Sequence, residues 1–149
     1  MIRSKTVLIS IHRFNDNSQI MKSVSYLMVR LGIGISMLGH GLVRIPKLNA
    51  FSEGMINNFQ SAPLPDFLLI PFSFALPFIE FLLGLLLIIG WQTKRAAIVG
   101  GFLMLALIAG TSLIENWSAL PSQMIHLLFF ILVYEFNQAN AFALDSKKD

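Results

Sequence analysis

The acidic residue Glu80 lies near the middle of an apolar run, Phe67 to Gly90, in which no other residue is charged. This run is long enough to cross a lipid bilayer once as a helix. A charged side chain at the centre of a membrane helix costs about 2.5–3.5 kcal/mol on insertion scales, so it is usually paired or faces a polar cavity. We therefore expect Glu80 to face the interior of the protein.

A second apolar run, Val24–Ile45, carries polar and small residues on one side when it is drawn as a helix. At 100° per residue, about one third of the circumference holds Tyr26, Arg30, Gly34, His40, Gly41 and Arg44. This face should point inward, and its glycines should let a neighbouring helix approach closely.

Arg30 is the first candidate partner of Glu80. A rise of about 1.5 Å per residue puts Arg30 on the inner side of Glu80 and His40 on its outer side. An ion pair between Arg30 and Glu80 would lock two helices together. A carboxyl group without a cation would instead favour the neutral acid, which can deliver a proton inside a membrane. Both roles stay open, and Glu80 is a candidate for proton handling.

His126 lies on a fourth apolar run at a depth similar to that of His40. Two histidines at one level could ligate a b-type haem, but hydrogen-bonded packing is the more frequent role of such a pair. His40 and Arg44, one turn apart, fit better as a hydrogen-bonding and cationic edge for a carbonyl or anionic group.

The composition indicates the elements that must position these residues. Hydrophobic residues make up 55% of the chain and charged residues 13%, which is typical of an integral membrane protein. Four runs approach or exceed the length of a spanning helix: Val24–Ile45, Phe67–Gly90, Ala96–Ile114 and Pro121–Asn137. The predicted fold is all-α, a polytopic bundle of four transmembrane helices.

The connection between the first two spans should contain a short interfacial helix. Phe51, Met55, Ile56 and Phe59 follow helical spacing between Pro46 and the prolines at 63 and 65. We divide the chain into a polar cytoplasmic tail at 1–20, dispensable or a start-site artefact, a membrane domain at 21–140, and a cytoplasmic C-terminal tail at 141–149. A cap over the bundle is an equally good interpretation of the connection.

The basic residues predict the orientation. One side of the membrane receives Arg3, Lys5, Arg13, Lys22, Lys94, Arg95, Lys147 and Lys148, whereas the other receives only Arg44 and Lys47. Both termini should therefore be cytoplasmic. The 149 residues contain no cysteine, which excludes thiolate chemistry, and no metal site is predicted. A net charge of +3 without a basic patch argues against nucleic-acid binding.

Two segments resemble the DoxX family of small four-helix bacterial membrane proteins. They are "LMVRLGIGISMLGHGLVRIPKL" and "PFIEFLLGLLLIIGWQTKRAAIVGGFLML". The family pattern has an early arginine and a glycine-rich end followed by a basic residue in the first span, and a glutamate in the second. Arg30, Gly39-His40-Gly41, Arg44 and Glu80 occupy these places, followed by the Thr93-Lys94-Arg95 turn. The resemblance covers about residues 24–132.

This resemblance implies a membrane subunit of a quinone-linked oxidoreductase complex, because the family takes its name from a subunit associated with thiosulfate:quinone oxidoreductase. Quinone is then the candidate cofactor. The resemblance implies that Glu80 and His40 handle its protons, and that Arg30, Arg44 and His126 are candidate contacts for it. A soluble or membrane redox partner would have to supply electrons, since the chain has no flavin fingerprint or iron–sulfur motif. The alternative is a non-enzymatic membrane scaffold or adaptor. The resemblance to a bacterial family implies the inner membrane of a bacterium, the lipid bilayer is the environment in either case, and the sequence leaves oligomerisation open.

Overall fold

The computed structural model describes the backbone of residues 2–147 and the side chains of residues 19–146. Helices dominate this part of the chain, and no strand occurs in it. The α-helices are α1 (Ile2–Arg44), α2 (Leu48–Asn58), α3 (Asp66–Ile89), α4 (Thr93–Leu113) and α5 (Leu120–Glu135), with short 3₁₀ turns at Ile45–Lys47, Asn137–Ala139 and Asp145–Lys147. The all-α prediction is confirmed.

Three helical stretches of the described chain are long and apolar enough to cross a membrane: Gln19–Asn58, which includes α2, then α3 and α4. Helix α5 is apolar but has only 16 residues, fewer than the about 20 that a span usually needs. The predicted second and third spans match α3 and α4 within three residues at each end. The fourth crossing stays a prediction.

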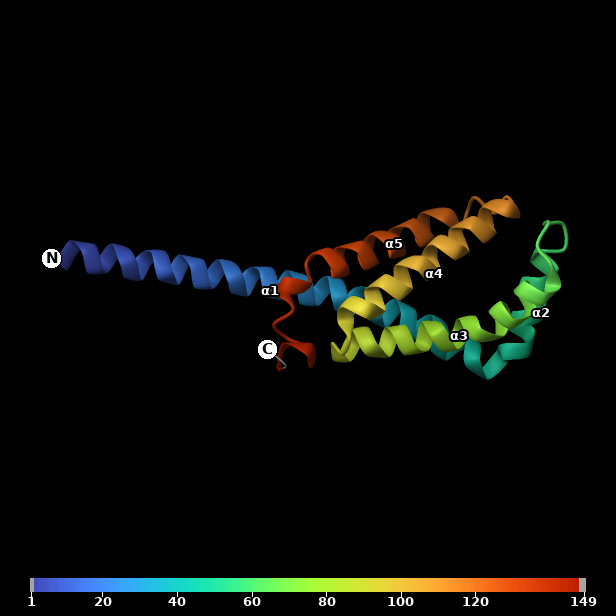
Figure 1. The fold of residues 1–149 in the computed structure, drawn as a ribbon, viewed down its shortest axis with the longest axis horizontal. Coiled ribbons are helices and arrows are strands. Elements are labelled where there is room, and N and C mark those ends of the chain that lie inside the picture. The colour runs from blue at the N-terminus through green and yellow to red at the C-terminus, as the bar shows by residue number, and fades with distance from the viewer. Residues whose placement is uncertain (1, 148–149) are drawn as a thin grey trace.

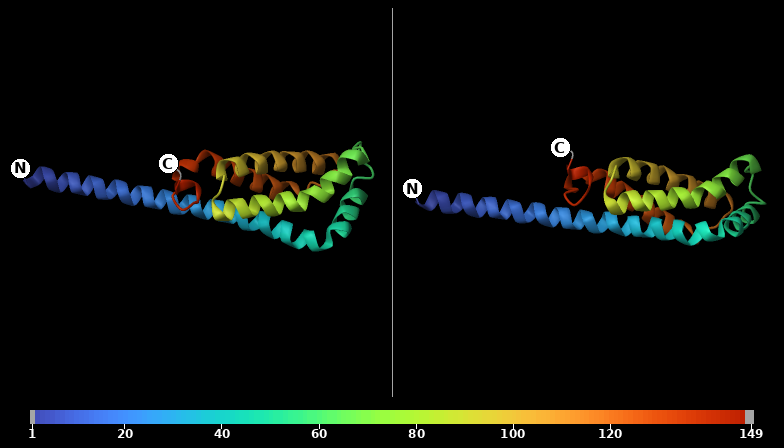
Figure 2. Two further views of the ribbon diagram at one scale, coloured as in Figure 1. Left: turned by 60° about the horizontal axis from the view of Figure 1, so that its bottom comes forward. Right: turned by 90° about the horizontal axis from the view of Figure 1, so that it is seen from below.

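The helices form two antiparallel pairs, α1 with α3 and α4 with α5. The pairs meet at the α3–α4 turn and diverge toward the other end of the bundle, where α2 lies (Figure 1). Figure 2 shows the same pairing from two further directions. We call the end at the α3–α4 turn the base and the opposite end the α2 end. Residues 137–147 lie at the base, which is also the end where α1 enters the bundle.

Close backbone contact joins α1 to α3. A Cβ atom at Gly41 would overlap the backbone of Phe81, and one at Gly84 would overlap the backbone of Leu38. At Gly34, a Cβ would lie 3.1–3.3 Å from atoms of Leu87 and Ile88. The prediction that Gly34 and Gly41 allow a helix to approach is therefore confirmed. This crossing fixes the polar face of α1 against the Glu80 face of α3.

The turn between α3 and α4 depends on Gly90. Its φ of +69° is left-handed, a conformation that costs glycine little, and a Cβ there would overlap Arg30 and Ala143. Asp145 then accepts hydrogen bonds from the backbone N–H groups of Gln92 (2.9 Å) and Thr93 (2.8 Å). The described part of the segment predicted as a C-terminal tail thus packs on the base and caps α4.

Helix α2 confirms the helix predicted between the first two spans, although its interfacial position stays a prediction. Its inner side contributes Phe51 and Met55, which pack against the core. The buried hydroxyl oxygens of Ser52 and Ser73 lie 2.7 Å apart. Ser73 also donates to the carbonyl of Ile70, so Ser52 must donate to Ser73. This contact attaches α2 to α3.

The proposed dispensability of residues 1–20 is not tested by the fold. The backbone of α1 is helical from Ile2 onward, so the predicted polar tail and the first span belong to one continuous helix. The side chains of residues 1–18 lie outside the described part of the structure, so the proposal that this tail is dispensable stays a prediction from the sequence.

Candidate functional site

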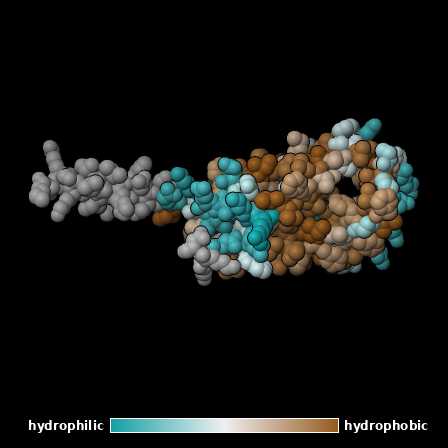
Figure 3. Space-filling view, viewed as in Figure 1, coloured by the Kyte–Doolittle hydropathy of each residue, from teal (hydrophilic) through white to brown (hydrophobic). Residues whose placement is uncertain are grey.

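A cavity of about 870 Å³ occupies the α2 end of the bundle, and residues from all five α-helices line it. The space-filling view shows a hollow toward this end, within a largely apolar surface (Figure 3). Its walls are mainly apolar and include Met37, Phe51, Phe59, Phe72 and Leu107. Such a shape with a few convergent polar groups is typical of a small-molecule site.

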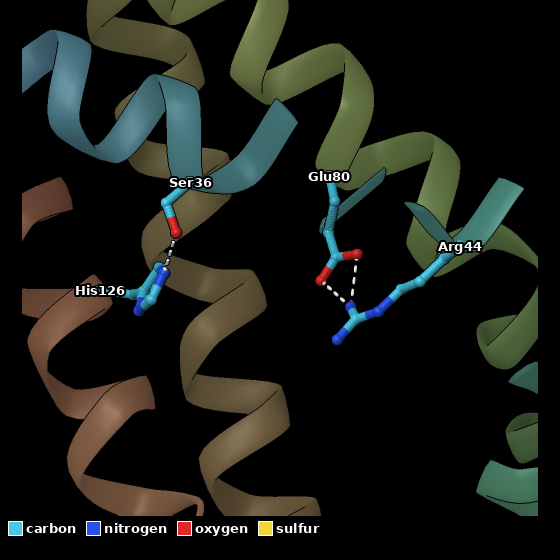
Figure 4. A network of polar contacts seen from close by, with 4 residues as sticks. All are labelled: Ser36, Arg44, Glu80 and His126. Atoms are coloured by element: carbon cyan, nitrogen blue, oxygen red, sulfur yellow. Dashed lines mark hydrogen bonds and ion pairs between the residues drawn. The ribbon is translucent and has the colours of Figure 1, made fainter. Parts of the chain in front are cut away.

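Glu80 lies in the wall of this cavity and is paired with Arg44. The Nη1 atom of Arg44 donates to both carboxylate oxygens of Glu80, at 2.5 and 2.6 Å. Figure 4 shows the second terminal nitrogen of Arg44 pointing away from the carboxylate. The predicted ion pair between Arg30 and Glu80 is therefore wrong, and Arg44 is the cation that accompanies Glu80.

Side-chain direction explains this exchange of partners. Side chains on a helix lean toward its N-terminus, so Arg44 on α1 leans toward the middle of the bundle. Helix α3 runs the opposite way, and Glu80 therefore leans toward the α2 end and meets Arg44. Arg30 leans toward the base, away from Glu80. The predicted depths are those of the backbone positions, so they do not include the opposite tilts of the side chains on the two antiparallel helices.

Arg30 is instead enclosed at the base, with only 2% of its surface exposed. It donates to the amide oxygen of Asn140 at 3.1 Å and to the carbonyl of Phe142 at 2.6 Å. Asn140 in turn donates to Thr93, and the hydroxyl of nearby Tyr26 lies 3.0 Å from the carbonyl of Val133. Arg30 is not among the residues that line the cavity. The structure thus separates it from the other four candidate site residues.

The two histidines predicted at one depth do meet. The ring centroids of His40 and His126 are 5.8 Å apart, and both residues line the cavity. His126 is held by Ser36 through Nε2 and by the carbonyl of Ser122 through Nδ1, both at 2.7 Å. A carbonyl only accepts, so Nδ1 carries a proton and Nε2 of the neutral ring accepts from Ser36 (Figure 4).

This arrangement does not fit axial ligation of a haem, because neither ring nitrogen of His126 is left to bind iron. It fits an orienting role for His126 instead. His40 differs, since its side chain forms no hydrogen bond with the residues that the structure describes and is exposed in the cavity wall. One imidazole is therefore fixed and the other is available to a ligand.

Arg44 also keeps donors for a ligand. Only its Nη1 is used by Glu80, so three further N–H groups on Nη2 and Nε have no partner within the described part of the chain. The ring of Phe51 on α2 lies 4.8 Å from the guanidinium carbon, which is a cation–π contact. Glu80 and Phe51 together hold the guanidinium in place beside His40.

Several polar residues of the site are absent from the sequence predictions. Thr111 donates to Gln123 across α4 and α5 at 2.8 Å, and both line the cavity. Ser36 and Ser122 fix His126. Ser122 could have been found by its position one turn before His126, whereas no sequence signal links Ser36 on α1 to α5.

The DoxX family model matches residues 25–113, more than half of the chain. The chain belongs to the DoxX family. No curated protein and no solved structure matches it. The DoxX match includes His40, Arg44 and Glu80, and also Arg30 at the base, whereas His126 on α5 lies beyond it. The protein is thus an integral membrane protein of the DoxX family.

Proposed function

We propose that this DoxX protein binds a quinone in the cavity at the α2 end and serves as the membrane subunit of a quinone-linked oxidoreductase complex. The observation that carries the proposal is the combination of available donors on His40 and Arg44 with mainly apolar cavity walls. A quinone needs this combination, because its ring carbonyls accept hydrogen bonds and its tail is apolar.

The roles of the residues follow from their contacts. Arg44 would donate from Nη2 or Nε to a carbonyl oxygen, and His40 would donate to the same or the second carbonyl. Glu80 holds Arg44 by two short hydrogen bonds, so it acts through Arg44 as a positioning residue. His126 would support the site from the side, since its own nitrogens are engaged.

Reduction of a quinone to a quinol takes up two electrons and two protons. His40 is the group that would exchange protons with the bound ring, because it is exposed in the cavity and free of other hydrogen bonds to described residues. Electrons would come from a partner protein that carries a redox cofactor, since this chain has no cysteine and no flavin fingerprint. In the predicted inner-membrane orientation, with cytoplasmic termini, the cavity lies in the outer half of the membrane.

The two tryptophans of the chain allow a direct test. Trp117 follows Asn116, which lines the cavity, whereas Trp91 lies in the α3–α4 turn at the base. Quinones quench tryptophan fluorescence on close approach. In detergent, a Trp91→Phe variant that keeps Trp117 should show saturable quenching by a short-chain quinone, and a Trp117→Phe variant that keeps Trp91 should not. Equal, non-saturating quenching of both would reflect partition into the micelle and would contradict the proposal.

Matched variants refine this test. Arg44→Met in the Trp91→Phe background should lower quinone affinity by about tenfold, the cost of one charge-assisted hydrogen bond. Arg95→Met is the control, because Arg95 is exposed at the base and contacts Gln92. The amount of quinone that can be extracted from the purified protein should be lower for the Arg44 variant and unchanged for the Arg95 variant. A stoichiometric partner protein without any quinone would instead favour the scaffold or adaptor function.

A further inference from the structure

The charge balance of the cavity depends on a single pair of residues. Apart from the two histidines, Arg44 and Glu80 are the only residues with acidic or basic side chains among those that line it, and they form an ion pair with each other. The Arg44–Glu80 pair therefore supplies hydrogen-bond donors to the cavity without adding a net charge.

We propose that Glu80 determines the class of ligand that this cavity takes: by cancelling the charge of Arg44, it selects uncharged carbonyl head groups over anionic ones. This inference rests on the proposed quinone site and adds the residue that sets its selectivity. Glu80 is suited to the task because 3% of its side chain is exposed, against 28% for Arg44. The carboxylate is thus enclosed behind the guanidinium, which presents its remaining donors to the ligand.

The physical reason is the cost of an uncompensated charge in an apolar environment. A carboxylate or phosphate head group would leave water for a cavity in which Arg44 is already neutralised, and would approach the carboxylate of Glu80. A quinone carbonyl accepts hydrogen bonds from the same guanidinium without bringing a charge. Rejection of anions by an existing like charge is a common source of specificity.

Exchanging one charge at a time tests the inference. Glu80→Gln keeps the shape of the side chain and leaves Arg44 without a counterion, so an anion should become the preferred partner. Arg44→Gln leaves Glu80 alone, and a cation should be preferred. The double variant Arg44→Gln/Glu80→Gln restores neutrality. The probes are a decyl-substituted benzoquinone, decyl phosphate and decyltrimethylammonium, which share one alkyl chain.

Isothermal titration calorimetry of the detergent-solubilised full chain should show that the wild type binds the quinone and neither ion. Glu80→Gln should gain affinity for decyl phosphate by about tenfold or more, and Arg44→Gln should gain as much for decyltrimethylammonium. The double variant should bind neither ion. The two single variants report independently, so a failure of one to fold leaves the other as the test.

The possible results separate the two proposals. A wild-type protein that binds none of the three probes would overturn the proposed quinone site itself. A wild type that binds the quinone, together with folded single variants that still reject both ions, would overturn the role of Glu80 alone. Equal binding of decyl phosphate and quinone by the wild type would also overturn it, because the ion pair would then exclude nothing.

Discussion

The base and the α2 end of the bundle each contain an arginine from the same face of α1, and the two are used differently. Arg30 at the base is 2% exposed and donates to two oxygen atoms of the C-terminal segment. Arg44, about four turns further along, faces a carboxylate on one side and a cavity on the other. The two regions thus each contain an arginine of α1, but only Arg44 is accessible from the cavity.

This difference shows how a buried charge can be assigned a role. The two terminal nitrogens of Arg30 donate to acceptors in the C-terminal segment, its buried Nε has no hydrogen-bond partner among the described residues, and the enclosed side chain does not line the cavity. Arg44 is satisfied on one nitrogen and retains donors that a ligand can use. Arg30 therefore stabilises the fold, whereas Arg44 belongs to the candidate site.

The largest effect should come from the helix crossing that supports both regions. Gly84→Ala should destabilise the bundle by about 3 kcal/mol or more, because the new Cβ overlaps the backbone of Leu38 and the helices must separate. Gly39→Ala is the control, since a Cβ there meets no atom within 4 Å. Thermal unfolding in detergent measures both. Equal melting temperatures would mean that α1 and α3 do not pack in this way.

Replacing the two arginines in turn tests the comparison itself. Arg30→Met should lower the free energy of unfolding by roughly 2–4 kcal/mol, since Asn140 and the carbonyl of Phe142 lose a charged donor. Its quinone binding per folded molecule should stay unchanged. Arg44→Met should do the reverse, with lost binding and a smaller change in unfolding. Quinone binding and the free energy of unfolding should be measured for both variants. If either substitution changed both quantities to the same extent, the assignment of Arg30 to the fold and of Arg44 to the site would be wrong.

The extent of two membrane-length helices could be predicted from the sequence, because a segment that crosses the hydrocarbon of a bilayer must be long and apolar. Apolar length alone located α3 and α4, and the spacing of Phe51 and Met55 located α2. The meeting of His40 and His126 also followed from depth, since their helices keep them at one level.

Contacts that depend on side-chain direction or irregular backbone were not predictable in the same way. Glu80 and Arg44 meet because antiparallel helices tilt their side chains toward each other, which a depth estimate ignores. Asn140 and Asp145 lie in a segment without periodicity, so no pattern indicated that it returns to Arg30 and α4. The cavity arises from the divergence of two helix pairs, a property of the assembled bundle.

A smaller effect is expected where the C-terminal segment caps α4. Asp145→Ala should cost about 1 kcal/mol, because the N–H groups of Gln92 and Thr93 lose their acceptor. Asp66→Ala is the matched control: Asp66 lies in the first turn of α3, where no side-chain cap is formed, and only its interaction with the helix dipole is lost. Chemical denaturation of both variants should give the larger loss for Asp145. A larger loss for Asp66 would contradict a cap at the base.

The smallest effect should be confined to α2. Ser52→Ala removes the donor to Ser73, a neutral hydrogen bond worth about 0.5–1.5 kcal/mol, so global stability should change little. Amide hydrogen exchange should nevertheless become faster in α2, because this bond and the packing of Phe51 attach α2 to the bundle. Exchange at the base should not change, and Ser61→Ala, an exposed serine after α2, should leave both regions as they are. Faster exchange at the base in Ser52→Ala would mean that the two ends open together, and the functional separation of Arg30 from Arg44 would then have to be abandoned.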